Sequence, residues 1–86
     1  MENMRNVAGY IATRYKDEYK ADIDEMKLHK LMYFAQRESY VMYDEPLFKG
    51  TFYGWKFGPI LKEVRKLYKE GNLSFEGSVN ERFKVL

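Results

Sequence analysis

The amino-acid sequence predicts a small, mainly α-helical domain with three main helices, a short extended aromatic segment and a small C-terminal β-hairpin. Three observations predict this class. Apolar residues recur at helical spacing in three separate stretches. One proline follows the second stretch and another opens the third. Aromatic residues alternate with other residues between those stretches. A chain of 86 residues is long enough for one domain, which we expect to span residues 1–86.

The first helix is expected over residues 5–19. Its apolar positions recur at helical spacing, which places them on one side of the helix. They are Val7, Ala8, Ile11, Ala12 and Tyr15. The polar residues from Lys20 to Asp22 indicate a link to the next helix.

The second helix is expected over residues 25–43. Asp24 is one candidate for its N-cap, and Asp22 with Glu25 three residues later is a rival start of the capping-box type. We expect one apolar stripe, widened by further apolar residues so that the helix is central in the domain. The stripe is Leu28, Leu31, Met32, Ala35 and Met42, and the widening residues are Tyr33, Phe34, Tyr40 and Val41. The helix ends before Pro46.

The segment 47–58 has a different pattern. Tyr53, Trp55 and Phe57 alternate with Gly54, Lys56 and Gly58, and this period of two predicts an extended segment with one aromatic face. The glycines on the other face would then allow another backbone to approach closely. Two interpretations of Trp55 stay open, namely packing in the core against the second helix and a partly exposed anchor for a partner.

The third helix is expected to start with Pro59 as its first residue and to end at a Gly71 cap. Its buried stripe is Ile60, Leu61, Val64, Leu67 and Tyr68. Basic residues form its other face, and they would be solvated or would contact an acidic protein or DNA phosphate. Weak alternation on both sides of Gly77 and Ser78 predicts a hairpin within residues 73–85.

Composition excludes several classes of function. The chain has no cysteine, which excludes disulfides and thiolate metal sites, and no apolar run near the ~20 residues that span a bilayer. The first five residues lack the apolar core of a signal peptide, so we expect a cytoplasmic protein without membrane association. A net charge of +2 is small for a dedicated nucleic-acid binder.

Catalytic and metal chemistry have little support in the sequence. His29 is the only histidine, and its spacing indicates no catalytic or metal partner, so we interpret it as structural or surface-exposed. The carboxylates of Asp22, Asp24 and Glu25 fit helix capping better than a metal cluster. We therefore expect neither an enzyme nor a cofactor.

Residues 26–59 contain three blocks whose order and spacing resemble a known family. The blocks are MKLHKLMYFAQ over residues 26–36, Pro46-Leu47-Phe48, and Trp55-Lys56-Phe57-Gly58-Pro59. They are similar to the KLQKLLYYAQ helix, the PLF block and the AWKYGPV block of the Panacea (SocA-like) antitoxin family. The chain departs from that pattern at Arg37, Glu38 and Ser39, where Gly-Trp-His is common, and at Gly54 and Lys62.

The resemblance implies a non-catalytic antitoxin from a two-gene system of bacteria or phages. Its partner would be a cognate protein toxin, which it would block directly or deliver to a protease system. The family usually continues into further helices, so we expect a short form or a fragment. The toxin-binding residues would then be Tyr53, Trp55, Lys56, Phe57, Gly58, Pro59, Lys62, Arg65 and Lys66.

An alternative from another class is a winged-helix-like regulator. The predicted order of helix, helix, short strand, helix and hairpin is compatible with that fold, and the third helix would place Lys62, Arg65, Lys66 and Lys69 near promoter DNA. The third helix lacks the asparagine and glutamine side chains that commonly read bases. The resemblance favours the antitoxin.

Overall fold

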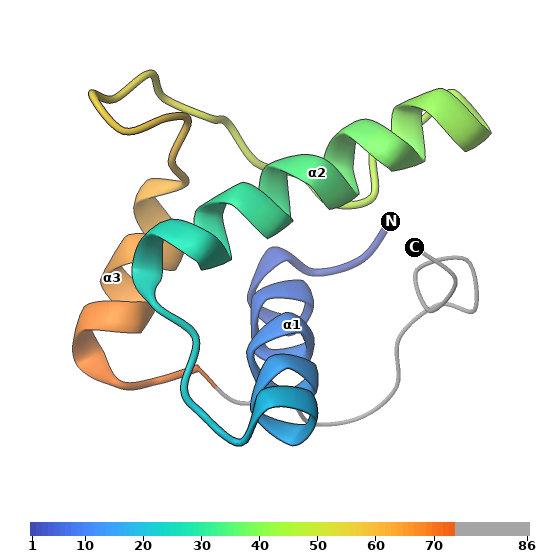
Figure 1. Ribbon diagram of the computed structural model, residues 1–86. Helices are drawn as coiled ribbons and strands as arrows, with labels where there is room; N and C mark the ends of the chain where they lie inside the picture. Colours follow the sequence, from blue (N-terminus) through green and yellow to red (C-terminus); the bar gives the residue numbers. More distant parts are fainter. Residues whose placement is uncertain (74–86) are drawn as a thin grey trace.

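The computed structural model describes residues 1–73 and confirms a mainly α-helical architecture with three helices. The helices are α1 (Met4–Tyr19), α2 (Glu25–Tyr43) and α3 (Lys62–Glu70). Helix α2 crosses over α1, and α3 lies beside the N-terminal half of α2 (Figure 1). The predicted hairpin falls on residues 73–85, of which all but the first lie outside the described residues.

Helix α1 forms as its apolar pattern predicts. Asn3 caps it by accepting hydrogen bonds from the backbone N–H groups of Arg5 and Asn6, at 2.9 and 3.3 Å. The helix ends at Lys20, whose backbone is in the left-handed region. Its predicted stripe faces the core, with Val7 and Ala8 fully buried and Ile11, Ala12 and Tyr15 partly buried against the core cluster.

Asp24, rather than Asp22, starts helix α2. The Asp24 carboxylate accepts a hydrogen bond from the backbone N–H of Lys27 at 2.8 Å, while Asp22 lies 3.4 Å from the ammonium of Lys16. Both ends of α2 match the prediction. The helix ends where Asp44 takes a left-handed backbone conformation, before Pro46.

The predicted stripe of α2 is wrong in part. Leu28, Met32 and Ala35 are buried, but Leu31 and Met42 are exposed, as are all four residues that were expected to widen the stripe. Three polar side chains occupy the buried face in their place, namely His29, Gln36 and Ser39. Helix α2 is therefore buried on one face and carries exposed apolar residues on the opposite face.

The buried polar side chains of α2 explain this shift, because each one holds the connection between α2 and α3. Gln36 Oε1 accepts hydrogen bonds from the backbone N–H groups of Leu47 and Phe48, and its amide nitrogen donates to the Phe48 carbonyl at 2.8 Å. The Ser39 hydroxyl donates to the Glu45 carbonyl at 2.8 Å. These bonds place Leu47 and Phe48 in the core, where both are fully buried.

Helix α3 begins later than predicted. Pro59 is not its first residue, because the backbone of Ile60 pairs with Tyr53 instead of joining the helix, with N–H···O distances of 2.8 and 2.9 Å. Leu61 is the N-cap and Lys62 the first helical residue. At the other end, Gly71 caps the helix at φ +70°, as predicted. No helix among residues 1–73 is long and apolar enough to cross a membrane.

Candidate interaction surface

The aromatic segment forms a tight loop rather than an extended strand. The Tyr53–Ile60 backbone pair closes the loop at its base, and the Gly58 N–H donates to the Trp55 carbonyl at 3.0 Å across its tip. Gly58 has φ +122°, a conformation that side-chain-bearing residues rarely adopt. In Figure 1 this loop rises above α3, beside the start of α2.

The predicted role of the glycines is wrong. A Cβ atom built on Gly54 or Gly58 would meet nothing within 4 Å, so neither glycine admits a neighbouring backbone. Close approach occurs at Gly50, where a Cβ would lie 3.0 Å from the sulfur of Met4 and 3.2 Å from Leu61 Cδ2. The requirement for glycine in the loop is conformational, at Gly58.

The aromatic side chains of the loop are exposed. Trp55 is 45% exposed, so it is not part of the buried core, although it lies against α2. Tyr53 and Phe57 are exposed to a similar degree, and the rings of Trp55 and Phe57 meet edge to face at 6.0 Å between centroids. Trp55 and Phe57, together with Pro59, line a small cavity against Met26, His29 and Lys30 of α2.

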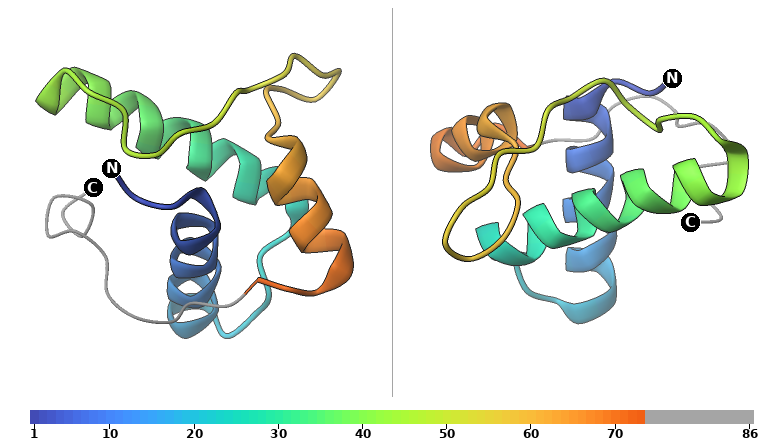
Figure 2. Two further views of the ribbon diagram at one scale, coloured as in Figure 1. Left: turned by 180° about the vertical axis from the view of Figure 1, so that it is seen from behind. Right: turned by 90° about the horizontal axis from the view of Figure 1, so that it is seen from above.

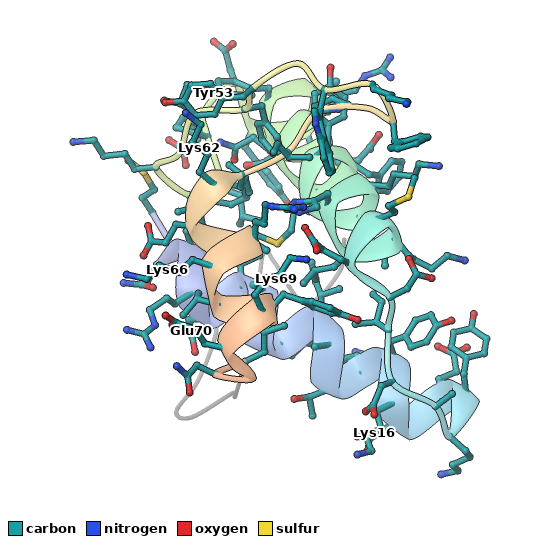
Figure 3. All side chains as sticks on the ribbon, turned by 90° about the vertical axis from the view of Figure 1, so that its left-hand side faces the viewer. Lys16, Tyr53, Lys62, Lys66, Lys69 and Glu70 are labelled. Atoms are coloured by element: carbon teal, nitrogen blue, oxygen red, sulfur yellow. The ribbon has the colours of Figure 1, made fainter. Side chains whose placement is uncertain are left out.

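Basic side chains of α3 stack on the loop aromatics. The ammonium of Lys62 lies 4.1 Å from the centre of the Tyr53 ring, and the guanidinium of Arg65 lies 4.7 Å from the centre of Trp55. Figure 3 shows Lys62 next to Tyr53 at the top of α3. Lys56 alternates with the aromatic residues in the sequence, yet its ammonium lies 5.4 Å from the Phe57 ring centre.

Glu25 connects this surface to the core, and sequence reasoning missed that role. Its carboxylate lies 2.8 Å from the Arg65 guanidinium, 3.1 Å from His29 Nε2 and 3.9 Å from the Lys69 ammonium. The four-residue spacing of Glu25 and His29 on a helix could have indicated their contact. Arg65 is 40 residues from Glu25, so local spacing gives no signal for that contact.

His29 is buried between the start of α2 and the start of α3, where it has a structural role. Its Nδ1 accepts a 3.4 Å hydrogen bond from the backbone N–H of Leu61, the N-cap of α3, and its Nε2 contacts Glu25. The three carboxylates near the start of α2 have different partners. Asp22 pairs with Lys16, Asp24 caps the helix and Glu25 pairs with Arg65. Residues 1–73 contain no cluster of three or more His, Cys, Asp or Glu side chains suited to a metal ion.

Eight of the nine predicted site residues thus come together in the loop and on the adjacent side of α3. The ninth, Lys66, is exposed one turn beyond Lys62 (Figure 3). We call the set the loop surface: Tyr53, Trp55, Lys56, Phe57, Gly58, Pro59, Lys62, Arg65 and Lys66. It combines exposed rings with cations and presents them on a fixed backbone, an arrangement suited to binding another macromolecule.

Comparison with known proteins gives the family. No curated protein and no solved structure matches the chain significantly. A family model described as "Antitoxin SocA-like, Panacea domain" matches residues 28–85, which is more than half of the chain and includes most of α2, the loop surface and α3. The protein therefore belongs to the SocA-like Panacea antitoxin family.

Proposed function

We propose that this protein is an antitoxin that neutralises a cognate toxin by binding it directly through the loop surface. The observation that carries the proposal is the family match. It covers the loop surface, and the family is one of antitoxins. The family also favours a non-catalytic role, and the proposal assigns no reaction to the chain. The exposed aromatic side chains supply the contact, since tryptophan, tyrosine and arginine dominate the binding energy of many protein interfaces.

Preorganisation of the loop supports this assignment. The Tyr53–Ile60 backbone pair, the turn at Gly58 and the stacking of Lys62 and Arg65 hold the rings in place before any partner arrives. A surface that is already ordered loses less conformational entropy on binding. Free cations on a mobile loop would lack this advantage.

The same geometry favours a protein partner over promoter DNA. Lys62 stacks on Tyr53, and Arg65 is shared between Trp55 and Glu25, so two of the predicted phosphate contacts are already engaged. Helix α3 has only 9 residues, from Lys62 to Glu70, and presents both acidic and basic side chains. This combination suits a mixed polar and aromatic protein interface better than a phosphate backbone.

Co-expression tests the proposal. The product of the neighbouring gene is expressed alone and together with this chain, and growth is scored. We expect the neighbour to be toxic alone and the chain to restore growth. Trp55→Ala should weaken the rescue and lower the affinity of the purified complex by at least about tenfold, which is the effect of removing a dominant interface residue.

Lys20→Ala is a suitable control, because Lys20 is exposed at the end of α1 and is not part of the loop surface. Thermal unfolding of each variant should be measured in parallel. A Trp55→Ala protein that folds like the parent and still neutralises fully would show that the loop surface is not the contact. A harmless neighbour, or failure of the folded parent chain to rescue growth, would contradict the antitoxin proposal itself.

A further inference from the structure

Helix α2 buries three polar side chains beside its buried apolar ones, and it exposes many large apolar residues. His29, Gln36 and Ser39 face inward. Eight large apolar residues of the same helix are exposed, namely Met26, Leu31, Tyr33, Phe34, Tyr40, Val41, Met42 and Tyr43. Phe34 and Val41 are 52% and 70% exposed, so they lie outside the core that residues 1–73 form. Large apolar side chains exposed in this number on one helix indicate an interaction site.

The exposed residues form rows along the helix. Residues seven apart lie on nearly the same side of an α-helix, with a drift of about 20°. Met26, Tyr33 and Tyr40 therefore form one apolar row, and Phe34 with Val41 forms a second. In the view from above, α2 crosses in front of α1, whose two ends appear on either side of it, and α3 lies off to one side (Figure 2).

A row of positive charge runs between the two apolar rows. Lys30 and Arg37 are exposed, seven residues apart, and their helical positions lie between Tyr33 on one side and Phe34 on the other. Within residues 1–73 neither side chain forms an ion pair. We call this arrangement the α2 face: Met26, Lys30, Tyr33, Phe34, Arg37, Tyr40 and Val41.

The α2 face is continuous with the loop surface. Met26 and Lys30 line the same small cavity as Trp55 and Phe57. Further along the helix, the Tyr33 ring meets Phe52 edge to face at 5.2 Å, and Phe52 in turn packs near the buried Phe48. The two surfaces therefore join at the N-terminal half of α2, and contact with the core holds Tyr33 in place.

We propose that the α2 face is a docking site for an acidic segment of the toxin whose carboxylates are flanked by apolar side chains. This inference rests on the proposed antitoxin function and extends its interface from the loop surface onto α2. Carboxylates on the partner would pair with Lys30 and Arg37, and their apolar neighbours would cover the Tyr33 and Phe34 rows. Opposite charge at a shared face gives orientation and speeds association, and the flanking apolar contacts give affinity.

Charge argues against a second copy of this chain as the occupant. In a two-fold dimer of antiparallel helices, each side of the seam meets the same side of the other copy. The Lys30 and Arg37 row would then face itself, with like charges in proximity, which opposes association. An acidic partner removes that repulsion and supplies the missing counter-charges.

Charge reversal tests the inference. Lys30→Glu with Arg37→Glu changes only exposed residues, so the fold should be retained. We expect the double variant to lose rescue of growth in the co-expression assay and to bind the purified toxin at least about tenfold more weakly. Binding of the parent chain should weaken with rising NaCl concentration, and binding of the variant should not. Lys20→Glu with Lys49→Glu alters the net charge equally, away from the α2 face, and should behave as the parent.

Phe34→Ser with Val41→Ser tests the apolar rows without altering charge, and it should also weaken binding at unchanged thermal stability. If the parent chain rescues growth and both α2 variants, correctly folded, rescue equally well, the α2 face is not the site although the antitoxin function stands. If the parent chain fails to rescue, the inference falls together with the proposed function. The parent chain could also dimerise, and the Phe34→Ser with Val41→Ser variant could abolish the dimer. That result would overturn the inference, because a second copy would then occupy the α2 face.

Discussion

Gln36 shows how a single polar side chain organises this fold. Its buried amide makes three hydrogen bonds to the backbone of Leu47 and Phe48, at 2.8 to 3.2 Å. These bonds satisfy backbone groups that no helix or sheet would pair, since buried N–H and C=O groups need partners. Two blocks of the family pattern, the α2 block and Pro46-Leu47-Phe48, are thereby joined by one side chain.

Replacing Gln36 with alanine should destabilise the protein by about 2–3 kcal/mol, because buried backbone groups of Leu47 and Phe48 would lose their partners. Urea denaturation followed by circular dichroism measures the loss. Gln36→Glu is the informative companion, since it keeps the acceptor for both N–H groups and removes the donor to the Phe48 carbonyl. A loss below about 0.5 kcal/mol for Gln36→Ala would show that water or a shifted backbone satisfies these groups.

Sequence reasoning could not find this role, because a glutamine on an apolar helix gives no signal of its long-range partners. The same holds for His29, whose bond to the Leu61 N–H spans 32 residues. Sequence signals predicted the helix ends correctly where the ends depend on neighbouring residues. Asp24 was identified as one of two candidate caps, and Gly71 as the end of α3, because capping depends on adjacent residues.

At the scale of elements, α3 and the loop behave as one unit. Lys62 and Arg65 stack on Tyr53 and Trp55, and Glu25 anchors Arg65 to α2. The sequence indicated the aromatic alternation and the helix correctly, but it placed the helix start at Pro59. The Tyr53–Ile60 backbone pair delays that start by three residues, to Lys62, and only the tertiary structure creates this pair.

Trp55 is the only tryptophan in the chain, so its fluorescence reports on the loop directly. Arg65→Ala should shift its emission to longer wavelength and increase quenching by acrylamide, because the ring would lose its stacked cation. Arg65 is partly exposed, so the stability cost should stay near about 1 kcal/mol. Lys66→Ala is the matched control on the same helix and should leave the spectrum unchanged. An unaltered spectrum for Arg65→Ala would show that the Trp55 environment does not depend on the Arg65 side chain.

At the scale of the whole molecule, the fold class followed from the pattern, but the choice of buried face did not. Helix α2 is apolar on most of its circumference, and period alone cannot decide which apolar side faces the core. The connection between α2 and α3 determines the buried face, because its backbone N–H and C=O groups form hydrogen bonds with His29, Gln36 and Ser39. Five of the apolar residues that remain outside are assigned to a partner, namely Met26, Tyr33, Phe34, Tyr40 and Val41.

Substitution of two leucines of α2 compares the contribution of buried and exposed positions to stability. Leu28 is fully buried and Leu31 is 36% exposed, although both belong to the predicted stripe. Leu28→Ala should cost about 2–5 kcal/mol, because it leaves a cavity in the core, whereas Leu31→Ala should cost less than about 1 kcal/mol. The total stability of a domain this size is about 4–13 kcal/mol, so the first change could remove half of it. Thermal and urea unfolding of the two variants gives the comparison. Equal losses would mean that the Leu31 side chain is packed in solution as fully as Leu28, in disagreement with its exposure in the structure.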